Sequence, residues 1–308
     1  MYMIKTLLYI NSIKMYNPIN IVCLVRNIKK AQSCFGEFFF QPNIQFIEQD
    51  VCEKLNYKKD VDYIVHAASQ ASPKYFFSDP VGTINANVLG TNNLLRFAFE
   101  KKVKSFLFFS TGEVNGDIFD KKNLVSENDY GIVDPLIVRN CYAESKRMGE
   151  NMCVSWYKQY NVPAKIVRPS HTYGPGFNIE DGRVFASFVS SILKNKNIVI
   201  KSDGLAKRSF CYIADAIRAY FLVLLNGENG QAYNVSNDYE ISIKQLAELL
   251  INISGNNNIK IEYDYDKNKV SSSSLHGLLD NKKVKELGWS PKIKEEEGFK
   301  RTIESFNL

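Results

Sequence analysis

Two stretches of sequence decide the fold of this chain: FFSTGEVNGD at residues 108–117 and RNCYAESKRMGENM at residues 139–152. The first is the end of a run that starts with SFLFFS at residues 105–110, whose composition predicts a fully buried strand. The second opens a long helix that we predict over residues 141–160. A buried strand followed by a helix of this length is typical of a parallel sheet covered by helices.

The same alternation extends outward in both directions. Further strands are predicted at residues 19–25, 43–46, 61–67 and 164–168, with a helix over residues 83–101. Beyond residue 170 we expect helices at 181–193 and 213–225, a short strand at 198–200, and a polar linker at 271–274. Another helix opens at Ser242, with Gln245 completing a capping box. The pattern predicts an α/β fold with a doubly wound parallel sheet over residues 1–170, which also receives parts of 205–240. Residues 171–308 mainly form a smaller C-terminal substrate lobe.

The beginning of the chain differs from the usual start of a nucleotide-binding domain. Such a domain opens with a strand and a glycine-rich turn, which brings a pyrophosphate to the N-terminus of the next helix. Here MYMIKTLLYINSIKMY, residues 1–16, reads as that next helix, and no G-x-G-x-x-G or G-x-x-G-x-x-G precedes Ile21. We therefore expect the first strand and its glycine-rich turn to be missing from this chain.

Composition excludes several classes of function. The net charge of +6 is mild, and no stripe of lysine and arginine with interleaved aromatics predicts a nucleic-acid partner. The apolar stretch at residues 3–13 is too short to span a membrane. The six cysteines contain no C-x-x-C pair, so we expect no metal site and a reducing, cytoplasmic environment.

Tyr142 and Lys146 carry the chemistry that the long helix suggests. Residues four apart share a helix face, so the two side chains project together. A neighbouring ammonium and a cationic nicotinamide lower the pKa of a phenol, which then takes a proton from a substrate hydroxyl while hydride leaves the same carbon. Thr111, at the end of the buried strand, is placed to hydrogen-bond that hydroxyl. A Y-x-x-x-K pair occurs by chance in most proteins of this length, so the motifs around it decide its meaning.

Those motifs occur in a fixed order along the chain. Besides the two opening stretches they are HAASQASP at 66–73, DPVGTINANVLGTNNLL at 79–95, IVRPSHTYGPG at 166–176, DGRVFASF at 181–188, GLAKRSFCYIAD at 204–215 and LDNKKVKELGWSP at 279–291. From residue 20 to 306 the series resembles the extended short-chain dehydrogenases, the NAD-dependent epimerase/dehydratase family that acts on nucleotide sugars. Within that family it is most similar to UDP-glucuronate decarboxylases. The resemblance implies a Rossmann-like fold, an enzyme, a UDP- or dTDP-linked sugar as substrate, and a homodimer formed through the 141–160 helix.

The resemblance also implies roles for individual residues. The catalytic residues are Tyr142 as the base, Lys146 as its modulator, Thr111, and Glu113 as an acidic group at the sugar ring. The cofactor-binding residues, which also include Tyr142 and Lys146, are Asp50 and Val51 at the adenine, with Ala67, Ser69, Phe109 and Thr172. The substrate-binding residues are Asn85, His171, Asn178, Arg183 and Arg208. Two arginines near a diphosphate fit the bidentate pairing of guanidinium with phosphate.

The type of nicotinamide cofactor stays open. NAD enzymes usually carry Asp or Glu at the end of the second strand to hold the ribose hydroxyls. Here that strand ends in LVRNIKK, so Arg26, with Lys29 and Lys30, is placed to accept a 2′-phosphate. NAD is the family's usual cofactor, and NADP is the alternative.

Departures from the family pattern bear on the reaction. Gly112 stands where 4,6-dehydratases carry an aspartic acid, which argues against elimination of water. Decarboxylases carry a lysine near Asn85 and an arginine at Gly176, and this chain has neither cation. The prediction is an enzyme that oxidises the sugar at C4 to a keto intermediate, with UDP-glucuronate decarboxylation ahead of 4-epimerisation and dTDP-glucose 4,6-dehydration. The alternative from another class is a catalytically impaired relative that serves in binding or assembly, because the glycine-rich turn is missing.

Overall fold

A four-stranded parallel sheet forms the centre of the molecule. The computed structural model describes residues 1–14, 17–118, 124–180, 182–265 and 278–306. The strands lie in the order β11 (Ala232–Val235), β6 (Ala164–Pro169), β4 (Ser105–Phe109) and β3 (Tyr63–His66), and each neighbouring pair is parallel. The predicted parallel α/β architecture is therefore confirmed.

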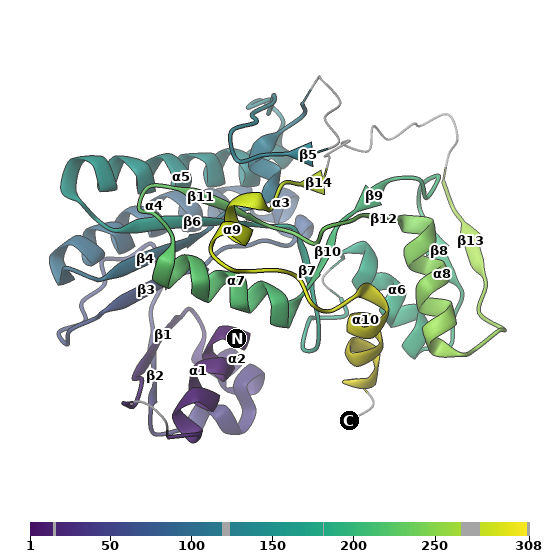
Figure 1. Cartoon of the computed structure of the whole chain (residues 1–308), viewed down its shortest axis with the longest axis horizontal. Coiled ribbons are helices and arrows are strands. Elements are labelled where there is room, and N and C mark those ends of the chain that lie inside the picture. Colours follow the sequence, from purple (N-terminus) through teal and green to yellow (C-terminus); the bar gives the residue numbers. More distant parts are fainter. Residues whose placement is uncertain (15–16, 119–123, 181, 266–277, 307–308) are drawn as a thin grey trace.

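Helices cover both faces of this sheet (Figure 1). On one face, Phe106 and Phe108 of β4 pack with residues of α4 (Pro80–Lys101) and α5 (Cys141–Tyr160). On the other face, Leu107 packs with residues of α7 (Ile213–Asn226). Alternate side chains of a strand point to opposite faces, so a strand buried on both sides must be apolar throughout, as SFLFF is.

A second, two-stranded parallel sheet lies apart from the first. Its strands are β1 (Ile21–Val25) and β2 (Ile44–Glu48), and it is accompanied by α1 (Tyr2–Ser12), α2 (Ile28–Phe35) and the 3₁₀ helix η1 (Gly36–Phe40). Among the described residues no strand joins β1 to β3. Val22, Tyr63 and Val65 are correspondingly exposed, at 40%, 45% and 39%. Strands of a parallel sheet are normally buried, so the sheet is interrupted between β1 and β3.

The C-terminal lobe has its own apolar core. Phe185, Phe210 and Phe299 are buried within it, and α6 (Val184–Leu193), α8 (Ile243–Ser254) and α10 (Glu295–Glu304) surround them. Short strand pairs complete the lobe and its junction with the sheet: β7 (His171–Tyr173) with β10 (Phe210–Tyr212), β9 (Lys207–Arg208) with β12 (Ile241–Ser242), β8 (Ile198–Ile200) with β13 (Ile261–Tyr263), and β5 (Leu124–Val125) with β14 (Leu278–Leu279). The remaining elements are α3 (Pro73–Ser78), η2 (Gly112–Asn115), η3 (Val138–Asn140) and α9 (Lys282–Glu286). Domain limits at residue 170 stay a prediction.

Most predicted elements are present, with differences at their ends. The helix predicted at 83–101 begins earlier, at Pro80, because the Asp79 carboxylate accepts a hydrogen bond from the Gly82 N–H at 3.0 Å and caps it. The helix predicted from residue 181 begins at Val184, after Gly182 with φ +84°. The Ser242–Gln245 capping box is confirmed, with N···O distances of 3.0 and 2.8 Å. The linker predicted at 271–274 lies outside the described residues, and none of the described helices is long and apolar enough to cross a membrane.

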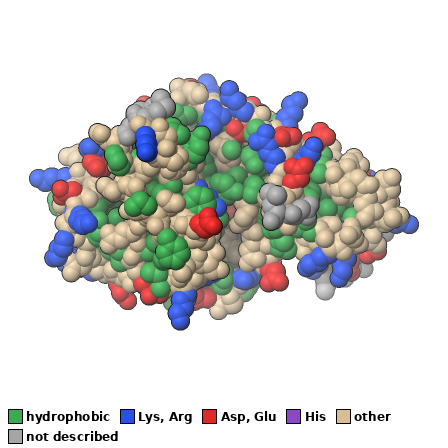
Figure 2. Space-filling view, turned by 90° about the horizontal axis from the view of Figure 1, so that it is seen from below, with side chains coloured by type: hydrophobic (Ala, Val, Ile, Leu, Met, Phe, Trp, Pro, Cys, Tyr) green, Lys and Arg blue, Asp and Glu red, His purple; other side chains and the backbone are tan. Residues whose placement is uncertain are grey.

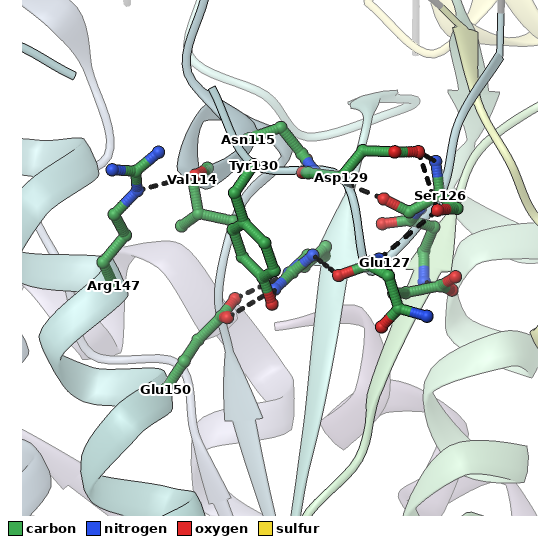
Figure 3. A network of polar contacts seen from close by, with 11 residues as sticks. Val114, Asn115, Ser126, Glu127, Asp129, Tyr130, Arg147 and Glu150 are labelled. Atoms are coloured by element: carbon green, nitrogen blue, oxygen red, sulfur yellow. Dashed lines mark hydrogen bonds and ion pairs between the residues drawn. The ribbon is translucent and has the colours of Figure 1, made fainter. Parts of the chain in front are cut away.

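A buried ion pair fastens α5 to β6. The Arg168 side chain is 1% exposed and contacts both carboxylate oxygens of Glu150, at 2.8 and 2.7 Å. Arg168 also donates to the Glu127 carbonyl at 2.9 Å and to the Tyr130 hydroxyl at 3.1 Å. Figure 3 shows Glu150 on its helix facing the loop that carries Glu127 and Tyr130. The pair therefore joins a helix, a strand and a loop at one point.

A second arginine of α5 extends this network to the turn after β4. Arg147 Nε donates to the Val114 carbonyl at 2.7 Å (Figure 3), and Nη2 donates to the Gly131 carbonyl at 2.8 Å. Asp129 holds the same loop by accepting hydrogen bonds from the Ser126 N–H and hydroxyl, at 2.8 and 2.7 Å. The turn that follows β4 is thus held in place from α5.

Glu150→Ala is expected to lower the free energy of unfolding by about 3–5 kcal/mol, because it leaves the Arg168 charge buried without its partner. The control is Glu297→Ala, which removes the partner of Arg301 in a half-exposed pair and should cost less than about 1 kcal/mol. Denaturation by urea measures both. Equal losses for the two variants would contradict the assignment.

Candidate active site

The candidate site lies at the edge of the sheet where its parallel strands end. Strands β3, β4 and β6 end there side by side, and this edge is where ligands bind in doubly wound α/β folds. Helix α5 delivers Lys146, whose Nζ donates to the Phe109 carbonyl at the end of β4 at 2.6 Å. Thr111 follows that strand directly, and its side chain hydrogen-bonds to the Tyr142 phenol. The structure therefore brings Thr111, Tyr142 and Lys146 together.

Burial sets the electrostatics of this cluster. Lys146 is 2% exposed, and burial lowers its pKa to about 7. Burial, with the nearby charge of Glu113, raises the pKa of Tyr142, while Thr111 and the charge of Arg183 oppose that rise. Phe76 stacks on the Tyr142 ring with centroids 4.7 Å apart. The phenol alone is a poor base, so further positive charge must be added before it ionises at neutral pH.

Glu113 lies beside this cluster, held by a partner that the sequence motifs did not assign. Its N–H donates to the Thr111 hydroxyl at 3.3 Å, so Thr111 caps the short η2 helix. Its carboxylate pairs with Arg139, whose Nη1 lies 2.6 Å from Glu113 Oε2. Arg139 stands three residues before Tyr142, and the only sequence signal was its place in the RNCYAESK run.

Buried polar atoms without a protein partner mark where a cofactor fits. The hydroxyls of Ser69, Ser110 and Ser170 follow the ends of β3, β4 and β6, and all three are buried without a hydrogen-bond partner among the described residues. Buried polar groups are nearly always hydrogen-bonded, so such a row indicates a polar ligand. Lys146 uses one of its three N–H donors on Phe109 and has others to offer. These groups fit the ribose and amide of a nicotinamide nucleotide.

The predicted adenine-side residues follow β2 of the two-stranded sheet. Asp50 follows β2, and its carboxylate accepts a hydrogen bond from the Cys52 N–H at 2.8 Å. Val51 is buried against Gly90 of α4. The charge of Arg26, which follows β1, acts on both Asp50 and Asp79. Arg26 and Asp50 therefore lie within electrostatic reach of each other, and their part in nucleotide binding stays a prediction.

The remaining predicted cofactor residues lie at the strand ends. Ala67 follows β3 and is exposed, while Phe109 ends β4 and packs edge-on against Tyr220 at 4.7 Å. The Thr172 hydroxyl lies 3.2 Å from the Tyr220 hydroxyl. His66, by contrast, is buried, and its Nε2 lies 3.0 Å from the Thr91 hydroxyl, so it is held within the fold.

The predicted substrate residues divide into two groups. Arg183 acts electrostatically on Tyr142, and Arg208 and Glu113 act on each other, so both arginines face the catalytic cluster. None of the hydrogen bonds found among the described residues links Asn85 or Asn178 to that cluster; Asn178 accepts from the Glu180 N–H at 2.9 Å instead. His171 is exposed on β7, with its ring 5.7 Å from Phe210.

The space-filling view shows a face of the molecule on which the two lobes meet (Figure 2). Figure 2 shows a hollow there on one face of the molecule, with lysine and arginine side chains scattered around it rather than gathered into one stripe. Sequence reasoning missed three residues of the site, Phe76, Arg139 and Tyr220, because each reaches it only through the packing of distant segments.

Comparisons with known proteins identify the family of this chain. The sequence profile of the NAD dependent epimerase/dehydratase family matches residues 17–236. UDP-glucuronic acid decarboxylase 6 of Arabidopsis thaliana is 35% identical over 272 residues, which cover 87% of this chain and 75% of that protein. The dTDP-D-glucose 4,6-dehydratase of Mus musculus is 31% identical over 294 residues, covering 91% and 80%.

Solved structures share the fold. The Pal structure from Bacillus thuringiensis superposes with a TM-score of 0.80 at 26% identity, covering 99% of this chain and 95% of that one. A UDP-glucuronic acid 4-epimerase from Bacillus cereus, solved with NAD, gives a TM-score of 0.83 at 22% identity, with the same coverage. With the profile match over most of its length and relatives above 30% identity, this chain belongs to the NAD dependent epimerase/dehydratase family.

Proposed function

We propose that this protein is an NAD-dependent UDP-glucuronate decarboxylase. The observation that carries the proposal is the cluster of Thr111, Tyr142 and Lys146 at the sheet edge, with Glu113 beside it. The similarity to plant UDP-glucuronic acid decarboxylases at 35% identity supports the choice of substrate. Incubation of the purified protein with NAD and UDP-glucuronate, followed by product mass and CO₂ measurement, tests it.

Thr111 and Tyr142 act directly on the C4 hydroxyl of the sugar in this reaction. NAD, when bound, accepts the hydride from C4 of the sugar and later returns it. Thr111 orients the C4 hydroxyl, and Tyr142 takes its proton, so C4 becomes a ketone. The ketone is β to the C5 carboxylate, which leaves as CO₂ while its bonding electrons form an enolate. The enolate gains a proton at C5 from solvent, and Tyr142 gives its proton back to the C4 oxygen when hydride returns.

Lys146 is placed to act on both the nicotinamide nucleotide and the base, Tyr142. Its ammonium favours the phenolate of Tyr142 and offers donors to ribose hydroxyls. The diphosphate is assigned to Arg183 and Arg208. Asp50 and Val51 are assigned to the adenine, and Arg26 keeps NADP as the alternative cofactor, because a guanidinium suits a 2′-phosphate.

One structural observation separates the related reactions. A Cβ at Gly112 would lie 3.0 Å from the Leu279 side chain, so the position where dehydratases carry an acid is closely packed here. This supports decarboxylation or 4-epimerisation over elimination of water from a dTDP-sugar. Product analysis distinguishes the two, since an epimerase returns an isomer of unchanged mass.

The interruption of the sheet favours one function from a different class. Because β1 and β3 do not pair with each other among the described residues, the protein is also a candidate for a catalytically impaired relative that acts in binding or assembly. Unpaired sheet edges favour association with other chains. Titration with NADH, followed by nicotinamide fluorescence, separates the two functions, because an enzyme must bind the nucleotide and an impaired relative need not.

Homodimerisation and a cytoplasmic location complete the proposal. The exposed apolar side chains of α3, α4 and α5 include Phe77, Val81, Ile84 and Met148, which are 39–69% exposed. An exposed apolar patch of this kind marks an interaction surface. All six cysteines are free thiols, which suits a reducing compartment.

Tyr142→Phe is expected to lower kcat by about 10²- to 10⁴-fold, because the ring remains but its proton acceptor is lost. NADH affinity should stay within a few-fold of the wild type, since Lys146 is intact. Steady-state turnover of UDP-glucuronate and fluorescence titration measure the two effects. Unchanged turnover in Tyr142→Phe would remove this residue from the mechanism.

Lys146 is expected to make stability depend on pH. Its pKa in the folded protein is about 7, below that of an unfolded lysine, so above pH 7 the unfolded state holds the proton that the folded state has released. The free energy of unfolding therefore gains a rising contribution from this group, up to about 1.4 kcal/mol per pH unit. Lys146→Met should remove that contribution between pH 7 and 8.5. Lys158→Met, at the exposed end of the same helix, should leave the slope unchanged in urea denaturation; equal slopes in all three proteins would refute the assignment.

Val81→Asp is expected to weaken self-association by placing a charge in the exposed patch on α4. Leu225→Asp, equally apolar and 59% exposed on α7 across the sheet, is the matched control. Sedimentation velocity should show a dimer for the wild type and Leu225→Asp and a larger monomer fraction for Val81→Asp. A wild type that sediments as a monomer at all concentrations contradicts the dimer.

A further inference from the structure

We propose that Arg139 is the residue that selects an acidic sugar: it exchanges the Glu113 carboxylate for the carboxylate of the substrate. This inference deepens the proposed function, on which it rests, and assigns a cation to the uronate. The sequence motifs supply no such cation, since Asn85 and Gly176 stand where related decarboxylases carry lysine and arginine.

The position of Arg139 is tied to the catalytic base. It lies on η3 (Val138–Asn140), which runs directly into α5 at Cys141, one residue before Tyr142. Its guanidinium lies 5.5 Å from the centre of the Phe76 ring, and Phe76 stacks on Tyr142 at 4.7 Å. Arginine, ring and phenol thus form one stack, so a group bound by Arg139 has a defined place relative to the base.

The present contact already shows that a carboxylate fits against Arg139. Glu113 Oε2 lies 2.6 Å from Nη1, in the geometry of a charge-assisted hydrogen bond. A guanidinium has five N–H donors, and this pair uses one of them. The Arg139 and Glu113 side chains are 41% and 30% exposed, so a ligand can reach both. A substrate carboxylate that takes two donors forms a stronger, bidentate pair than Glu113 does.

The other cations near Tyr142 have different contacts. Lys146 is buried and donates to Phe109, and Arg147 donates to the backbone carbonyls of Val114 and Gly131. Arg183 and Arg208 belong to the C-terminal lobe, where they suit the diphosphate. Arg147 also pairs with Glu144 of its own helix at 3.7 Å, whereas Arg139 pairs with Glu113, the acidic residue beside Thr111.

The exchange has a consequence for Glu113. Once Arg139 binds the substrate, Glu113 loses its ion-pair partner while it remains beside Thr111 and the sugar ring. Glu113 is thereby free to contact the sugar ring only when an acidic sugar is bound. A neutral sugar leaves the ion pair between Arg139 and Glu113 intact.

Equilibrium binding tests the inference independently of turnover. Isothermal titration with UDP-glucuronate and with UDP-glucose, in the presence of NADH, compares four proteins: wild type, Arg139→Met, Arg139→Lys and Arg301→Met. Arg139→Met should weaken UDP-glucuronate binding by about 10- to 100-fold and change UDP-glucose binding by less than about 3-fold. Arg139→Lys keeps the positive charge but loses the two-donor geometry of the guanidinium. Its affinity for UDP-glucuronate should therefore lie between those of the wild type and Arg139→Met. Arg301→Met, which opens a surface pair on α10, should match the wild type for both ligands.

A second variant separates binding from structural support. Glu113→Gln removes the competing carboxylate, so UDP-glucuronate should bind more tightly than to the wild type, and adding Arg139→Met should abolish that gain. If the Glu113–Arg139 pair only stabilises the fold, Glu113→Gln and Arg139→Met will weaken the binding of UDP-glucuronate and of UDP-glucose alike. That result overturns the inference. A protein that binds UDP-glucuronate in this Arg139-dependent way but releases no CO₂ refutes the proposed decarboxylation and leaves the role of Arg139 standing.

Discussion

The buried ion pair between Arg168 and Glu150 is the interaction on which the rest of the structure depends. It joins β6 in the middle of the sheet to α5 on its surface, and through the Glu127 carbonyl and the Tyr130 hydroxyl it also holds a long loop. Two charges removed from water are costly unless each is paired and hydrogen-bonded. The pair therefore permits one placement of α5 along the sheet, and that placement puts the catalytic side chains at the strand ends.

The position of α5 also buries the two ionisable catalytic side chains, Tyr142 and Lys146. Lys146 is buried beneath the ring of Phe108, with a backbone carbonyl as its hydrogen-bond acceptor, and Tyr142 is covered by Phe76. Without a ligand, burial disfavours the charged form of both groups. The proposed reaction needs both charges, which explains why unpartnered hydroxyls surround them: the cluster is complete only when a polar, charged ligand lies against Ser69, Ser110 and Ser170.

Selection of substrate follows from a second, more exposed pair. Arg139 and Glu113 are half-exposed at the surface of the site, so solvent screens them and an exchange of partners costs little. The contrast with the Arg168–Glu150 pair is one of burial: the buried pair fixes the framework, and the exposed pair is free to respond to a ligand.

The sequence by itself determined the class of fold, nearly every helix and strand around the site, and the pairing of Tyr142 with Lys146. These follow from local rules: apolar runs such as SFLFF form buried strands, and side chains four apart share a helix face. The start of α4 at Pro80 was misjudged because a capping side chain, Asp79, outweighed the apolar pattern. Tertiary structure alone decided that Phe76 covers the base, that Arg139 reaches Glu113 across 26 residues, and that the sheet is interrupted. Those contacts join segments far apart in the chain, and their geometry depends on how α5 packs against the sheet, which no local pattern encodes.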